Sequence, residues 1–305
     1  MRHLVLVLAI AGCKPDLGAP ASLITEPRIL AVRSEPAEVT PNHDVTLTSL
    51  IVDATGTLAP DVAWGFCSQP APLSSDNVVG DDCIYGAASL TERGPQITTT
   101  IPITACSVFG PTPPAPAPGE PPRRPHDADI TGGYYQPIRA LAKLGGSDQV
   151  PGIGLTRITC DLANASLDVV QQFRARYHAN TNPVVSRVVA QLPNEADARD
   201  LPVALPAHTA IPLRVRWTDA SAETFPVFDP QSRTLVDHRE AIRVSWFTSD
   251  GALASERTGR TEADLETYAE NTWTTPDAGP THLWIVVRDT RGGVAFESFD
   301  VTIAP

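Results

Sequence analysis

The chain is poor in basic residues, and lysine is almost missing. Among its 305 residues, Lys and Arg total 23 and Asp and Glu total 35, which gives a formal net charge of −12. Lys14 and Lys143 are the only lysines, and no basic stripe runs along the sequence. Such a surface repels phosphate backbones. We therefore expect no nucleic acid among the partners of this protein.

The sequence also lacks the short motifs of catalysis. It contains no H-E-x-x-H, no G-x-S-x-G and no phosphate-binding glycine loop, and its seven histidines show no metal-ligand spacing. The segment from Gly152 to Arg157 has two glycines of a dinucleotide loop, but Arg157 replaces the third and no β-α-β pattern surrounds it. These absences favour a protein that is not an enzyme and uses no cofactor.

The hydrophobic run at the amino terminus is too short to cross a membrane. It extends over seven residues, Leu4 to Ile10, whereas a membrane-spanning helix needs about 20. Arg2 and His3 precede it, and the small residues Ala11 and Gly12 follow it. This order is typical of an export signal.

The four residues Ile10-Ala11-Gly12-Cys13 resemble the bacterial lipobox. The resemblance implies that residues 1–12 are a lipoprotein signal peptide and that the Cys13 thiol carries diacylglycerol, usually with an acylated amine. Cys13 would then begin the mature chain and attach it to the membrane. The alternative is a buried first strand that happens to hold a cysteine. The position, the small residues and the abrupt end of hydrophobicity favour the lipobox.

The segment after Cys13 is predicted to be a lipidated tether. Residues 14–27 contain three prolines, one glycine and no helical period, so we expect residues 13–25 to be extended. Lys14 stands where lipoproteins of enteric bacteria that stay at the inner membrane carry aspartate. We therefore expect a cell-envelope protein, preferably at the outer membrane, on its periplasmic or its surface face.

Four cysteines remain after Cys13, and an even number in an exported chain predicts disulfide bonds. Three pairings are open, and sequence alone does not decide among them. We prefer the sequential pairing because it needs no threading. A four-cysteine zinc site is disfavoured, because the sequence has no C-x-x-C pair. The preferred disulfide pairs are Cys67 with Cys83 and Cys106 with Cys160.

Strand-like alternation dominates the C-terminal part, residues 182–305. Apolar residues recur at every second position in the segments 211–217, 242–246, 283–287 and 299–303, which predicts strands with one buried face. Asp289 to Gly293 predicts a tight hairpin turn. The segment 286–303 is similar to the last two strands of bacterial immunoglobulin-like and PKD-like domains. The resemblance implies an antiparallel β-sandwich.

Residues 26–181 read as a distant copy of this domain, so the predicted fold class is all-β, with tandem Ig-like β-sandwiches. Val62–Trp64 and Val244–Trp246 are matching Val-x-Trp segments, and we expect both tryptophans in the cores. The first copy carries insertions: a proline-rich loop at 110–125, and a short amphipathic helix after Ser166, which is placed as its N-cap.

Asp127 and Asp129 are the candidate metal ligands. They lie beside two glycines in the segment 126–133, and alternate carboxylates on such a loop could hold Ca²⁺. The further acidic positions and the terminal glutamate of a calcium loop are missing. Turn-capping aspartates are therefore the preferred interpretation, and no metal site is assigned.

Two functions fit these observations. The first is a membrane-anchored envelope lipoprotein that acts as a non-enzymatic binding or spacer module, with an envelope protein as its partner. The alternative is a lipid-anchored hydrolase whose site lies on the insertions of the first domain. A pocket of carboxylates with a histidine or a serine between residues 110 and 160 would favour the hydrolase.

Overall fold

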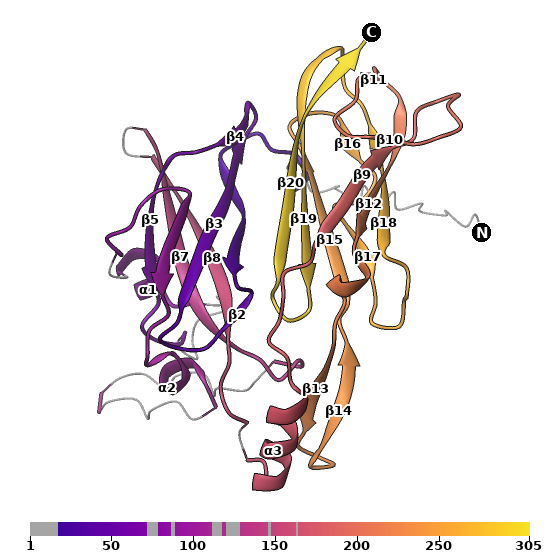
Figure 1. Ribbon diagram of the computed structural model, residues 1–305. Helices are drawn as coiled ribbons and strands as arrows, with labels where there is room; N and C mark the ends of the chain where they lie inside the picture. The colour runs from indigo at the N-terminus through magenta and orange to yellow at the C-terminus, as the bar shows by residue number, and fades with distance from the viewer. Residues whose placement is uncertain are drawn as a thin grey trace, which may run out of the picture.

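The computed structural model describes residues 18–71, 79–86, 89–111, 118–119, 129–145, 148–162 and 164–305. Strands make up about half of these residues, and the helices are short. The all-β prediction is confirmed. The strands build two sandwiches, which lie side by side in Figure 1.

The N-terminal sandwich consists of two four-stranded sheets. In the first, β3 pairs with β1 on one side and with β4 and β6 on the other. The second has the order β2-β8-β7-β5. The strands are β1 (Arg28–Glu35), β2 (Glu38–Val39), β3 (Asp44–Asp53), β4 (Gly56–Leu58), β5 (Asp61–Phe66), β6 (Gln96–Thr100), β7 (Tyr134–Gly145) and β8 (Asp148–Ile158).

The C-terminal sandwich consists of two five-stranded sheets with the orders β10-β9-β12-β18-β16 and β11-β20-β19-β15-β17. The first contains β9 (Val185–Ala190), β10 (Arg199–Asp200), β12 (Ala210–Trp217), β16 (Ala252–Leu253) and β18 (Tyr268–Thr274). The second contains β11 (Leu205–Pro206), β15 (Ile242–Thr248), β17 (Arg257–Arg260), β19 (Gly279–Asp289) and β20 (Val294–Ala304).

The remaining elements lie outside the two sandwiches. A two-stranded ribbon, β13 (Thr224–Asp229) with β14 (Thr234–Arg239), extends below the C-terminal sandwich in Figure 1 and runs beside α3 (Leu167–Arg176). The other helices are α1 (Asp81–Gly86), α2 (Ala105–Phe109) and the 3-10 turn η1 (Asp219–Ser221). As predicted, the Ser166 side chain caps α3, because it accepts a hydrogen bond from the Val169 amide. The predicted boundary at residues 181 and 182 lies between α3 and β9.

The alternating sequence pattern produces the two cores. In β12, inward Ile211, Leu213 and Val215 are buried, whereas the intervening side chains are more exposed. Trp64 and Trp246 are both fully buried, one in each sandwich. The predicted hairpin turn at 289–293 joins β19 to β20, with Gly292 at φ 96°.

A third apolar cluster lies between the sandwiches. It joins residues of β1 and β3 to residues of β19 and β20, among them Leu50 and Val52 on one side and Trp284 and Val286 on the other. The Trp284 indole also donates a hydrogen bond to Thr57 Oγ1 at 2.9 Å. The two sandwiches therefore share a packed interface.

The tether predicted over residues 13–25 ends earlier than expected. Ile24 is fully buried in the cluster between the sandwiches, and Ser22 is also buried. The Ile24 amide donates to Thr248 O at 2.8 Å, and the Thr248 amide donates to Ser22 O at 2.9 Å. Residues 22–24 thus pair with the end of β15 that β17 does not cover, and burial of Ile24 holds them there. Residues 1–17, with Cys13, lie outside the described residues.

Candidate functional site

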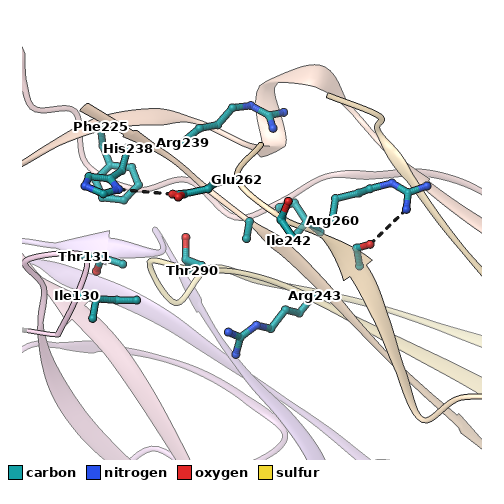
Figure 2. A pocket seen from close by; sticks show the side chains of 13 residues that line it. Ile130, Thr131, Phe225, His238, Arg239, Ile242, Arg243, Arg260, Glu262 and Thr290 are labelled. Carbon is teal, nitrogen blue, oxygen red and sulfur yellow. Dashed lines mark hydrogen bonds and ion pairs between the residues drawn. The ribbon is translucent and has the colours of Figure 1, made fainter. Parts of the chain in front are cut away.

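A cavity of about 520 Å³ opens where the two sandwiches meet the β13–β14 ribbon. The N-terminal sandwich contributes Ile130 and Thr131 from the loop before β7. The C-terminal part contributes the ribbon, the facing ends of β15 and β17, and Thr290 from the β19–β20 turn. Figure 2 shows these side chains around one space. The cavity is thus built from segments that are far apart in the sequence.

The lining of this cavity is mainly apolar. Phe225 and Ile242 are buried and form part of its wall. Ile130, in contrast, is 91% exposed, although it is a large aliphatic side chain. An exposed isoleucine beside a buried wall offers apolar surface to a ligand.

Charged side chains surround the apolar wall. Arg239, Arg243 and Arg260 line the cavity, and the lining carboxylate is Glu262, which lies 3.5 Å from His238 Nδ1. Arg239 donates to the backbone oxygen of Asp264, and Arg260 lies 4.0 Å from Glu266. Within the described residues, no carboxylate lies within ion-pair distance of Arg243.

Arg243 belongs to a group of arginines on adjacent strands. It lies on β15 directly opposite Arg288 of β19, and Arg257 of β17 pairs with Ser245 two residues away. Burial lowers the pKa of Arg288, and the nearby charge of Arg257 lowers it further. Like charges directly opposite each other on neighbouring strands destabilise a sheet. The arrangement therefore concentrates positive charge on a chain that is acidic overall.

A second cavity, of about 350 Å³, shares the lining residue Thr290 with the first. Its walls come from β1, β8 and the β19–β20 turn, with Leu155 and Val294 among its apolar residues. Arg288 also lines it, and its Nη2 donates to Leu30 O at 2.9 Å. Because Thr290 lines both cavities, we call the two cavities together the junction groove.

A buried ion network packs against Phe225, a wall residue of the junction groove. The Arg291 guanidinium lies over the Phe225 ring, 4.6 Å from its centroid. Its Nε lies 2.7 Å from Glu240 Oε1 and its Nη2 lies 2.7 Å from Glu223 Oε2. The side chains of Arg291 and Glu240 are 1% and 0% exposed. These contacts fix Phe225, and with it the wall of the cavity.

A second set of buried contacts joins the N-terminal sandwich to the C-terminal one. Glu38 Oε2 accepts hydrogen bonds from the Tyr177 hydroxyl at 2.6 Å and from the Asn180 amide at 2.9 Å, and it lies 3.2 Å from Arg157 Nε. The Asn180 side chain donates in turn to Asp289 at 3.2 Å. Since these groups are buried and bonded to one another, they oppose sliding of one sandwich on the other.

The Glu240 carboxyl predicts a pH dependence of stability. Its pKa is raised from the ordinary 4.5 to about 7, because burial and the nearby Asp289 charge raise it more than Arg291 and the hydrogen bond from the Glu223 amide lower it. A carboxyl whose pKa is higher in the folded chain stabilises the fold below pH 4.5, and this contribution is lost as the pH rises to about 7. Within this window, the free energy of unfolding should fall more steeply with pH in the wild type than in a Glu240→Gln variant.

Urea titrations of both proteins at several pH values would measure this difference. Burial raises the pKa of Asp289 in the same direction, so the variant should keep part of the slope. Parallel curves for the two proteins across the window would contradict the prediction.

The predicted disulfides lie in the N-terminal sandwich. Cys67 is bonded to Cys83 and Cys106 to Cys160, which is the sequential pairing, and all four lie in or against the N-terminal core. Asp127 lies outside the described residues, so the two-aspartate calcium interpretation stays a prediction.

Asp129 borders the second cavity, but its oxygens serve the loop itself. Its Oδ1 accepts from the Thr131 and Gly133 amides at 2.9 and 3.0 Å, and its Oδ2 accepts from the Tyr135 hydroxyl at 2.6 Å. These are the contacts of a turn-capping aspartate. No group of three metal-ligating side chains occurs among the described residues.

The hydrolase hypothesis required carboxylates to converge with a histidine or a serine between residues 110 and 160. Asp129 contacts neither residue type in the described part of this range. His126 and much of the proline-rich loop lie outside the described residues, and the hypothesis stays a prediction. No helix of the described chain is long and apolar enough to span a bilayer.

Sequence reasoning did not find the arginines of the junction groove. Arg243 and Arg288 alternate with apolar residues on their strands and look like ordinary solvent-facing positions. The two arginines lie opposite each other only because of the register between β15 and β19. The available signal was one arginine on each of two predicted strands, which is weak.

No family model and no curated protein sequence matches the chain. Among solved structures, it is similar to fibronectin(III)-like modules of Clostridium thermocellum CbhA (11% identity, 91% of this chain and 94% of that chain, TM-score 0.25). It is also similar to the D0-D1 domain of intimin (10% identity, 90% and 98%, TM-score 0.22). A third likeness is to the Yersinia pseudotuberculosis adhesin InvE (10% identity, 94% and 62%, TM-score 0.23). The all-β assignment of this chain rests on its own strands.

Proposed function

We propose that this protein is a non-enzymatic envelope lipoprotein that holds a partner protein in its junction groove. The groove supports binding because it combines apolar walls with Arg243, which has no ion-pair partner among the described residues. The anchor part of the proposal rests on the lipobox resemblance at Cys13. The preferred location is the outer membrane, on its periplasmic or surface face.

The observation that carries the proposal is the placement of the groove. Both sandwiches and the β13–β14 ribbon contribute to it, and the buried contacts of Arg291 and Glu38 hold these parts together. A pre-formed site of this kind binds without ordering the protein first, which lowers the cost of association. A simple spacer would not need such a site.

A photo-crosslinking amino acid at position 130 would test the binding function in intact membranes. Ile130 is 91% exposed at the cavity, so we expect it to give a defined adduct with a partner protein. Ile103 is 74% exposed and does not line the groove, which makes it the matched control. Identification of the adducts by mass spectrometry gives the readout.

Two results would contradict the proposal. Identical adduct patterns from positions 130 and 103 would place no partner at the groove. Full retention of a Cys13→Ala variant on the membrane would remove the lipid anchor from the account.

A further inference from the structure

The junction groove holds more positive charge than the fold itself uses. Among the described residues, Arg243 has no ion-pair partner, and Arg288 contacts a backbone oxygen rather than a carboxylate. Arg257, which lines neither cavity but lies on the neighbouring strand β17, has no ion-pair partner among them either. The chain has 35 acidic residues against 23 basic ones, so carboxylates for these arginines were available in the sequence. Their grouping costs stability through mutual repulsion. A bound anion would offset this cost.

The shape of the groove favours an extended ligand. Thr290 lines both cavities, and Arg243 lines one of them while Arg288 lines the other. Figure 2 places the Arg243 side chain on the side of the cavity where Ile130 and Thr290 lie. A ligand that follows the groove would therefore meet positive charge and apolar surface in turn.

The apolar lining decides between two kinds of anionic polymer. An anionic glycan would satisfy the arginines, but it has no side chain for the space bounded by Ile130, Phe225 and Ile242. A polypeptide offers carboxylates and apolar side chains at alternating positions when it is extended. The negative lining residues do not prevent this. Asp129 is occupied by its own loop, Asp289 accepts hydrogen bonds from Asn180 and from the Gly293 amide, and Glu262 lies beside His238.

We propose that the junction groove binds an extended acidic segment of a partner polypeptide. One carboxylate of the segment binds Arg243, with Arg288 and Arg257 adding attraction, and an apolar side chain next to it packs against Ile130 and Ile242. This inference rests on the proposed function, since it names the class of partner that the groove accepts.

A synthetic peptide of alternating leucine and glutamate, labelled with fluorescein, would test the proposal on the full-length protein in detergent. Fluorescence anisotropy should show binding that weakens as salt is added, because the contacts are ionic. The same peptide with glutamine for glutamate should bind at least about tenfold more weakly, since one charge-assisted hydrogen bond is lost at each arginine. Oligogalacturonate serves as the anionic glycan probe.

Variants locate the binding on the groove. Arg243→Gln should weaken the binding of the acidic peptide by about tenfold or more. Arg199→Gln is the matched control, because Arg199 is an exposed arginine on β10 of the opposite sheet and outside the groove. It should bind like the wild type. Circular dichroism and the urea midpoint would show that both variants keep the fold.

Three results would overturn the inference. They are equal affinity of the wild type and the folded Arg243→Gln variant, binding of oligogalacturonate in place of the acidic peptide, and no binding of either probe. The proposed function can survive these results. If position 130 still gives its adduct while the acidic peptide does not bind, the groove holds a partner of different chemistry.

Discussion

Replacement of Arg291 by alanine is expected to lower the free energy of unfolding by about 3–5 kcal/mol at pH 8, because the change leaves a buried carboxylate without its counter-charge. The Glu240 side chain is 0% exposed and bonds to Arg291 Nε at 2.7 Å. The second partner, Glu223, is 25% exposed and can turn to water. Most of the loss should therefore come from Glu240. Urea unfolding followed by tryptophan fluorescence would measure it.

The loss should be smaller at pH 5 than at pH 8. Burial raises the pKa of Glu240 to about 7, so at pH 5 the carboxyl is protonated and needs no counter-charge. Arg187→Ala is the control, because its ion pair with Asp200 is exposed, at 52% and 61%, and should contribute no more than about 1 kcal/mol. Equal losses for Arg291→Ala and Arg187→Ala at pH 8 would refute this account of the network.

The fold could be predicted because its signal is local. Alternation in segments such as 211–217 marks which face of a strand is buried, and the Gly292–Gly293 pair marks a turn. The interface between the sandwiches has no such signal. Trp284 and Val286 alternate with Leu283 and Ile285, so β19 is apolar on both faces. The sequence alone does not say which part of the chain covers the second face.

Ile24 illustrates the same limit. In a proline-rich stretch, one isoleucine does not indicate burial, and residues 22–24 were predicted to belong to a tether. Their hydrogen bonds to Thr248 depend on the open edge of β15 beyond β17, which exists only once the C-terminal sandwich has formed. The junction groove depends in the same way on the register that sets Arg243 opposite Arg288. Tertiary contacts, rather than local secondary-structure propensity, determine the position of residues 22–24 and the pairing of the two arginines.

Removal of the Cys106–Cys160 bond is expected to have the second large effect on stability. The bond joins α2 to the chain just after β8, across a sequence separation of 54 residues that includes β7 and the proline-rich loop. In the chain-entropy model, closing a loop of this size stabilises the fold by about 4 kcal/mol. A Cys106→Ala/Cys160→Ala variant should lose about that amount of unfolding free energy, as measured by urea titration under oxidising conditions.

The Cys67–Cys83 bond provides the comparison, because its separation is 16 residues and the same model gives it about 3 kcal/mol. Cys67 and Cys83 are each 2% exposed in the N-terminal core, so their replacement by alanine also removes buried sulfur and narrows the difference between the two variants. Reduction of the wild type avoids this complication, since it opens both loops and leaves the side chains in place. If the reduced wild type kept the stability of the oxidised protein, neither loop would limit the unfolded chain, and the N-terminal sandwich would be held by its apolar core alone.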